Sequence, residues 1–216
     1  MLMRAIPARR NSSTLFTKVA PLVLSFEEIE RLARIVVEHY GVDGIRLTGG
    51  EPTMRAHLPV LVSKLAALVV PADSASPLAG QPIDLAITTN GATLVNCVDE
   101  LRLAGIARIN ISLDTLDRKK FETMTRRDEL ARVLAGIEAA RHAGFSSVKI
   151  NAVIERGVND DEILDLAEFG RDTSKTQLID TIHQGCTIGR DCKINRLACQ
   201  WRGRIGGYDE GRQLAH

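Results

Sequence analysis

The sequence predicts an α/β protein whose parallel strands alternate with helices, built as a partial barrel or as an open layered sheet. Short apolar segments alternate with segments of helical periodicity through residues 24–172. This alternation requires crossover connections, which join parallel strands. With 216 residues, 44% of them hydrophobic and 25% charged, the chain can bury a core.

The first half of this region contains two helix–strand units. Ser25 and Glu28 form a capping box at the start of the first helix, and the strand 44–48 follows that helix. A second helix is expected from about residue 58. A loop rich in Pro, Ser and Gly then leads to the strand 83–90.

The second half repeats this order and ends with a fifth helix. Its first elements are expected as a helix over about 94–105, a strand over 108–114, a helix over 128–143 with Gly144 as its C-cap, and a strand over 148–154. Asn159 and Glu162 form a cap signature for the fifth helix, which ends near residue 171. The residues that follow have only weak hydrophobic periodicity and include several glycines. We therefore divide the chain into a divergent leader (1–23), an ordered region (24–172) and a divergent, poorly ordered tail (173–216).

Charge and hydropathy restrict the partners. The formal net charge of +1 gives no support for a nucleic-acid partner, and no apolar run approaches 18 residues, so no membrane span is expected. The basic leader, without an acid before Glu27, is compatible with a transit peptide or with an irregular segment. No signal-peptide pattern is present, so a cytoplasmic location is expected.

The four cysteines do not form a recognisable metal motif. Cys97 lies alone on a predicted helix, where a small core residue is the simplest interpretation. Cys186, Cys192 and Cys199 are separated by five and six residues, whereas zinc motifs usually have two to four between paired ligands. A metal site in the tail is kept only as the weaker alternative.

Polar residues share one face of each predicted strand, because side chains alternate across a strand. Thr89 interrupts the pattern. The polar set comprises Arg46 and Thr48 in the first strand, Thr88 and Asn90 in the second, Asn110, Ser112 and Asp114 in the third, and Lys149 and Asn151 in the fourth. A parallel sheet covered on both faces would be apolar on both. We interpret the polar face as a wet pocket inside a barrel, with a solvent-facing sheet as the alternative.

The cations on this face indicate an anionic ligand. Arg46 and Lys149 would project inward from two strands, where a phosphate or carboxylate would offset the cost of their burial, although pairing with neighbouring acids is the alternative. The stretch Gly49–Pro52 follows the first strand. Its glycines allow the main chain to approach a ligand, and Glu51 can accept hydrogen bonds from an ammonium group.

The motifs RLTGGEP, TTNG, INISLDTLD, VKINAV and GVNDDEI occur in this order. Over residues 24–172 the chain resembles the molybdenum cofactor biosynthesis protein A family, radical S-adenosylmethionine enzymes, classed as lyases, that carry out the 3',8-cyclisation of GTP. The resemblance implies a partial (β/α) radical-SAM-type barrel with irregular tails, GTP as substrate and a homodimer. It also implies S-adenosylmethionine contacts at Gly50, Glu51 and Ser112, and GTP-facing roles for Arg46, Thr88 and Lys149.

The cysteines depart from the pattern of this family. The family binds a 4Fe–4S cluster through Cys-x3-Cys-x2-Cys near its N-terminus, whereas no cysteine precedes Cys97 here, and the tail cysteines do not fit the family's second cluster. The catalytic residues and any metal ligands are therefore left unassigned. We expect a truncated or frameshifted copy, with two hypotheses: a cyclase whose cluster ligands come from another chain or reading frame, or a catalytically inactive remnant that still binds a ligand or none. A Rossmann domain is disfavoured, because no Gly-x-Gly-x-x-Gly follows a strand.

Overall fold

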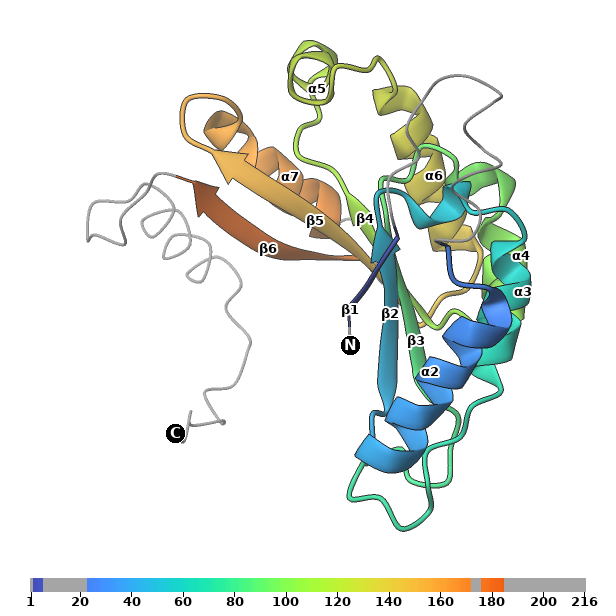
Figure 1. Cartoon of the computed structure of the whole chain (residues 1–216). Helices are drawn as coiled ribbons and strands as arrows, with labels where there is room; N and C mark the ends of the chain where they lie inside the picture. The colour runs from blue at the N-terminus through green and yellow to red at the C-terminus, as the bar shows by residue number, and fades with distance from the viewer. Residues whose placement is uncertain (1, 6–22, 172–175, 185–216) are drawn as a thin grey trace, which may run out of the picture.

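The sheet is parallel and its strands lie in the order of the sequence (Figure 1). The computed structural model describes residues 2–5, 23–171 and 176–184. The six strands are β1 Leu2–Ala5, β2 Gly44–Gly49, β3 Asp84–Thr89, β4 Arg108–Ser112, β5 Ser147–Glu155 and β6 Thr176–Gln184. Doubly wound folds reverse their strand order, whereas barrels keep it sequential. In the described residues β1 and β6 form the two edges and do not pair with each other, so the sheet is a partial barrel.

The helices mostly follow the predicted positions. The α-helices are α2 Phe26–Tyr40, α3 Leu58–Ala66, α4 Val98–Ala104, α5 Arg118–Thr125, α6 Leu130–His142 and α7 Ile163–Arg171, and short 3-10 turns are η2 Pro52–Met54, η3 Leu94–Asn96 and η4 Asp160–Glu162. Helices α2, α3, α4 and α6 lie on the same side of the sheet (Figure 1). The capping box of Ser25 and Glu28 is present, and Gly41 ends α2 in the left-handed conformation.

The hydrophobic core lies between the sheet and these helices. On the helix-facing parity of β2–β5, the apolar residues are at most 6% exposed; they include Ile45, Leu47, Leu85, Ile87, Ile109, Ile111, Val148 and Ile150. Residues of the opposite parity are mostly half-buried or exposed. The predicted alternation of the two faces is therefore confirmed.

Two glycines allow the loop after β3 to approach α6. Gly91 has φ +78°, and a Cβ there would lie 2.8 Å from Cγ2 of Ile111. A Cβ on Gly136 would collide with the carbonyl oxygen of Gly91. Larger residues at these positions would push α6 away from the end of the sheet.

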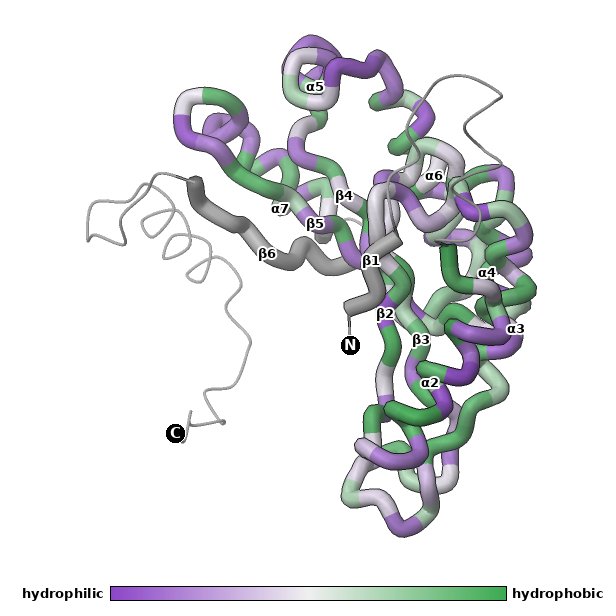
Figure 2. The backbone as a smooth tube through the Cα atoms, in the orientation of Figure 1, coloured by the Kyte–Doolittle hydropathy of each residue, from purple (hydrophilic) through white to green (hydrophobic). Residues whose placement is uncertain are grey.

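The structure differs from the sequence prediction in several elements. The third predicted helix is divided into η3 and α4, and Gly144 adopts its positive φ one residue after the C-cap of α6. Helix α5 was not expected, because its short, largely hydrophilic sequence has little apolar periodicity (Figure 2).

Two strands lie in segments where the sequence predicts no regular structure. Strand β1 belongs to the expected leader and pairs with β2, and β6 belongs to the expected poorly ordered tail and pairs with β5. An open sheet edge offers unpaired backbone groups, and a segment can pair with them even when its side chains do not alternate between apolar and polar. Cys186, Cys192 and Cys199 lie outside the described residues. No helix in the described part of the chain is long and apolar enough to cross a membrane.

Candidate functional site

The predicted ligand-facing residues lie on the sheet face opposite the core. Strand pairing places Thr88 beside Asn110 and Asn110 beside Lys149, in one row across β3, β4 and β5. Arg46 lies one row nearer the amino ends of the strands, beside Ala86, and Ser112 lies one row nearer the carboxyl ends. Arg46 is exposed and the other polar residues named here are half-buried. Their placement on a shared face is therefore confirmed.

Two cations of this face have no acidic partner in the part of the chain that the structure describes. Neither Arg46 nor Lys149 forms an ion pair or a side-chain hydrogen bond with the described residues. Arg108, one row below Asn110, differs because its guanidinium pairs with Asp84, with 3.1 Å between Nε and Oδ1. Because Lys149 is half-buried and unpaired, this face favours an anionic ligand over an apolar one, and the exposed Arg46 adds a second positive charge.

Glu51 of the Gly-Gly-Glu-Pro stretch is held mainly by the chain itself. Its Oε1 accepts hydrogen bonds from the N–H and the hydroxyl of Thr53 (3.1 and 2.6 Å) and from the hydroxyl of Thr89 (2.7 Å). Its Oε2 accepts one from the N–H of Asn90 at 2.7 Å. The carboxylate thus joins the loop after β2 to the end of β3. Each carboxylate oxygen has two lone pairs, and within the described residues Oε2 accepts only the hydrogen bond from Asn90, so Oε2 can accept one more from a ligand donor.

The contact with Glu51 explains why Thr89 interrupts the alternation of β3. Thr89 lies on the helix-facing parity and is buried. Its hydroxyl donates to Glu51 and accepts from the N–H of Gly91 at 3.1 Å. A buried hydroxyl with both contacts carries no unpaired polar group, so this position is polar for a structural reason.

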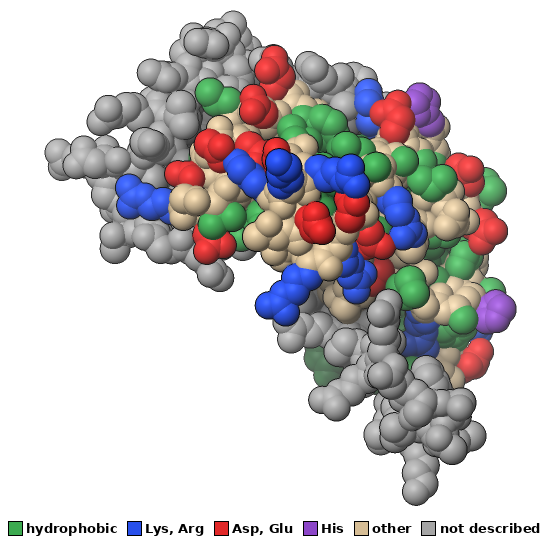
Figure 3. All heavy atoms as spheres, turned by 90° about the horizontal axis from the view of Figure 1, so that it is seen from above, with side chains coloured by type: hydrophobic (Ala, Val, Ile, Leu, Met, Phe, Trp, Pro, Cys, Tyr) green, Lys and Arg blue, Asp and Glu red, His purple; other side chains and the backbone are tan. Residues whose placement is uncertain are grey.

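The remaining predicted contacts lie at the carboxyl ends of the strands. Gly50 is exposed just beyond β2, and Ser112 is the half-buried last residue of β4. Figure 3 looks down on this end of the sheet and shows basic and acidic side chains intermixed, not separated into large patches. The charge pattern therefore favours a compact ligand over a long polyanion.

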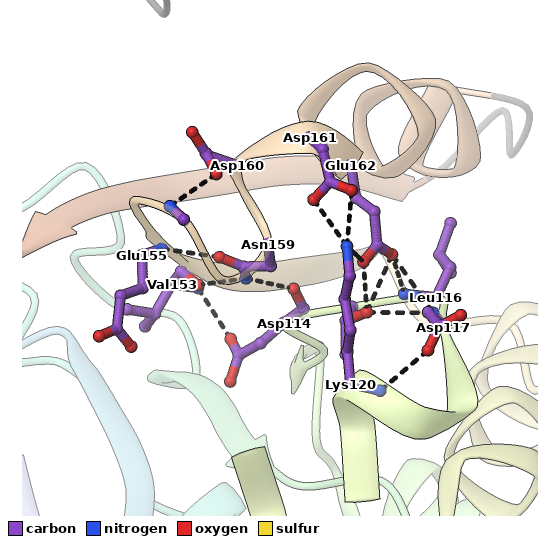
Figure 4. Close-up of polar contacts among 12 residues, drawn as sticks. Asp114, Leu116, Asp117, Lys120, Val153, Glu155, Asn159, Asp160, Asp161 and Glu162 are labelled. Carbon is purple, nitrogen blue, oxygen red and sulfur yellow. Dashed lines mark hydrogen bonds and ion pairs between the residues drawn. The ribbon is translucent and has the colours of Figure 1, made fainter. Parts of the chain in front are cut away.

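A second polar cluster, which we call the clasp, joins the end of β4 to the turn after β5. The clasp consists of Asp114, Thr115, Lys120, Asn159 and Glu162. All of these except Thr115 are labelled in Figure 4. Asn159 is 0% exposed, and its Nδ2 donates to the carbonyl oxygens of Asp114 (2.6 Å) and Val153 (2.9 Å). Its Oδ1 accepts from the N–H of Glu155 at 2.7 Å. Every hydrogen-bonding group of the amide thus contacts main chain.

The predicted capping role of the Asn159 side chain is wrong. Asn159 does occupy the N-cap position of η4, but its side chain makes no cap hydrogen bond. Helix α7 does follow η4 and ends at Arg171. The amide instead joins strand ends that are distant in sequence, because buried carbonyl groups there require donors.

Glu162 is the acidic centre of the clasp and is only 8% exposed. Its carboxylate accepts from the hydroxyl of Thr115 (2.7 Å) and the N–H of Leu116 (2.8 Å), and it pairs with Nζ of Lys120 (2.9 Å). Burial acts to raise the pKa of Glu162, but the hydrogen bonds from Lys120, Thr115 and Leu116 together outweigh burial and lower the pKa. Hydrogen bonds to Asp161 and then to Glu162 raise the pKa of Lys120.

The clasp as a unit is not predicted by the sequence pattern. Asp114 was placed correctly on the polar parity, and its Oδ1 accepts from the N–H of Val153 at 2.8 Å. Burial is the main cause that raises its pKa, and the hydrogen bond from Val153 opposes it. The signal available in the sequence is the pair of acid-rich motifs LDTLD, directly after β4, and NDDE, separated from the end of β5 by three residues.

The described residues do not fit an iron–sulfur cluster. No three His, Cys, Asp or Glu side chains come together as a metal site within the described part of the chain. Cys97 is a free, half-buried thiol there, between η3 and α4, and burial raises its pKa. Iron–sulfur clusters require several thiolates, so a single protonated thiol cannot hold one.

The parallel strands lie in sequential order, with helices on one side of the sheet and a polar face on the other, and this arrangement defines a barrel-type α/β protein. Comparison with protein-family models then identifies the family. Residues 11–170 match the Radical SAM superfamily, and the chain belongs to this superfamily. A solved structure of HydG, a maturase of the FeFe-hydrogenase, has a similar fold, with a TM-score of 0.52 and 16% identity over 76% of this chain and 38% of that chain.

Curated relatives share much higher sequence identity. A GTP 3',8-cyclase from Ectopseudomonas mendocina (strain ymp) is 47% identical over 68% of this chain and 41% of its own length. A GTP 3',8-cyclase from Xanthomonas campestris pv. campestris is 46% identical over 84% of this chain and 51% of its own length. The chain therefore spans about half, or less, of the length of these relatives.

Proposed function

We propose that this chain forms the substrate-orienting part of a GTP 3',8-cyclase-type protein in molybdenum cofactor biosynthesis, and that its polar face binds GTP. Arg46 and Lys149 would neutralise phosphate charge, and the Thr88 hydroxyl would hydrogen-bond the ligand. The observation that carries this proposal is the pair of cations on one face without acidic partners in the described residues. The similarity to GTP 3',8-cyclases supports GTP as the anion.

We further propose that the carboxyl ends of the strands bind S-adenosylmethionine. The exposed main chain of Gly50 can approach a ligand closely, and the Ser112 hydroxyl makes no hydrogen bond within the described residues. The remaining capacity of Glu51 Oε2 suits a methionyl ammonium group. When bound, S-adenosylmethionine supplies the radical chemistry of the superfamily; the residues of this chain bind and orient the two ligands.

No redox step is derived for this chain, because its described residues do not fit the iron–sulfur cluster. The cyclase hypothesis requires thiolates from outside the described residues, and the inactive remnant is the alternative hypothesis. Anaerobic reconstitution of the full chain with iron and sulfide distinguishes them. A brown protein with four irons per chain would support the cyclase hypothesis, whereas a colourless protein that binds GTP would support the remnant.

Calorimetric titration with GTP tests the binding proposal. We expect Lys149→Ala to weaken GTP binding about tenfold, since a charge-assisted hydrogen bond contributes about 1.5 kcal/mol or more. Lys119→Ala is the matched control, because Lys119 is an exposed lysine on α5, away from the polar face. An unchanged dissociation constant in Lys149→Ala, or an equal loss in both variants, would contradict the proposal.

Assembly and location are further predictions. The family resemblance supports a homodimer, and the cytoplasmic location stays an expectation from the sequence. Sedimentation of the purified chain at several concentrations would test the dimer, and a purely monomeric profile would count against it.

A further inference from the structure

We propose that Asn110 is a further ligand-contacting residue, whose side-chain amide donates a hydrogen bond to a phosphate oxygen of bound GTP. This inference rests on the proposed function of the polar face. It adds a contact in the middle of that face, between residues expected to meet the ligand.

Strand pairing places Asn110 at the centre of the polar face. Asn110 lies directly beside Thr88 on one side and Lys149 on the other. Neighbouring strands are about 4.8 Å apart, so Thr88 and Lys149 lie about 10 Å apart across Asn110. A ligand that contacts both of these residues must pass over Asn110.

The two unpaired cations flank the same position. Arg46 projects from β2 and Lys149 from β5, and the strands β3 and β4 lie between them. Both side chains have long flexible stems that can reach over a neighbouring strand. An anion that meets both cations is therefore held above β3 and β4, where Thr88 and Asn110 present their side chains.

The amide of Asn110 is available and chemically suited to a phosphate. Asn110 is half-buried, and within the described residues its side chain makes no hydrogen bond. Partly buried amides are destabilising unless they find partners, and an amide NH2 group offers two donors, whereas phosphate oxygens only accept. The nearest cation on its own strand, Arg108, is held by Asp84 and does not compete for the anion.

Two substitutions of Asn110 separate a phosphate contact from a structural role. We expect Asn110→Ala to weaken GTP binding about fivefold, which is the loss of one hydrogen bond of about 1 kcal/mol. Asn110→Asp keeps the shape but replaces the donor with a negative charge, so we expect a loss of about fiftyfold or more. The difference between these two variants should shrink as salt is raised from 0.05 to about 0.5 M, because salt screens charge repulsion.

Asn96→Asp is the matched control, since Asn96 is an exposed amide in η3, away from the polar face. It adds the same charge and should leave GTP binding unchanged. Circular dichroism checks that each variant is folded, and Asn110→Ser replaces any variant that is not. Equal dissociation constants for Asn110→Ala and Asn110→Asp, or a salt-independent difference, would overturn the inference.

The result also distinguishes this inference from the proposed function. If the unmodified chain does not bind GTP, or if Lys149→Ala binds as tightly as the unmodified chain, the proposed function fails. If Lys149→Ala weakens binding while both Asn110 variants bind normally, only the inference about Asn110 fails.

Discussion

The polar face of the sheet and the clasp are both polar and adjoin each other, but their hydrogen bonds differ. In the clasp, Asn159 and Glu162 direct their polar atoms at the chain's own groups. On the polar face, Arg46, Asn110 and Lys149 make no such contacts within the described residues. Residue type alone does not separate the two regions. The partners do: a satisfied polar cluster holds the fold together, and an unsatisfied one is available to a ligand.

Glu51 is intermediate between these two cases. Most of its carboxylate capacity is used by Thr53, Thr89 and Asn90, yet it lies at the end of β2 beside the exposed Gly50. Its first effect is to fix the loop that carries Gly50. The comparison therefore assigns Glu51 a positioning role in addition to any contact with a ligand.

The largest expected effect comes from reversing the polarity of one face. Ile111 is 0% exposed in the core, and Ile111→Asp would bury a carboxylate without a partner, at a cost of several kcal/mol. We expect loss of soluble, folded protein, measured by the soluble fraction after expression and by circular dichroism. Asn110→Asp, at the adjacent position on the opposite face, should remain folded. A soluble, cooperatively folded Ile111→Asp variant would contradict the assignment of the two faces.

Removal of the acidic centre of the clasp should have a smaller but substantial effect. Glu162→Ala leaves the hydroxyl of Thr115, the N–H of Leu116 and the ammonium of Lys120 without their acceptor. We expect the free energy of unfolding to fall by about 3 kcal/mol, measured by urea denaturation. Glu122→Ala, an exposed glutamate on α5, should change it by less than about 0.5 kcal/mol. Similar losses in the two variants would mean that the clasp contributes little.

The sequence predicts the face of each strand better than it predicts these contacts. Alternation is a local property, and the burial of Ile109 and Ile111 beside the half-buried Asn110 and Ser112 follows from it. The clasp depends on residues far apart in the chain: Glu162 contacts Thr115 across 47 positions. Asn159 and Glu162 also fit the local pattern of a helix cap. A prediction from the sequence therefore favours the cap over the long-range contacts that these residues make.

The edges of the sheet were harder to predict for a different reason. Strands β1 and β6 pair through their main chains with β2 and β5. Main-chain pairing requires only a nearby open edge and leaves little pattern in the side chains. The roles of Gly50, Glu51, Ser112, Arg46, Thr88 and Lys149 stay predictions, since the geometry places them but only binding experiments test them.

The smallest expected effect is a change in the pH dependence of stability at Asp114. Its pKa is raised above 3.8, chiefly by burial, so the protonated form is favoured in the folded state. The stability that this group contributes is therefore complete below the unfolded pKa and is lost as pH rises through the folded pKa. Asp114→Asn removes this titration, and the amide oxygen can still accept from the N–H of Val153.

We therefore expect Asp114→Asn to gain stability relative to the unmodified chain as pH rises from 3 to about 7, with most of the change just above the unfolded pKa. Urea denaturation at several pH values measures it. Glu162, whose pKa is lowered, contributes stability that is lost as pH falls, so Glu162→Gln should show the opposite trend. If the free energy of unfolding varies with pH in the same way in Asp114→Asn and in the unmodified chain, burial does not raise the pKa of Asp114. Asp114 would then belong with the ligand-accessible residues of the polar face.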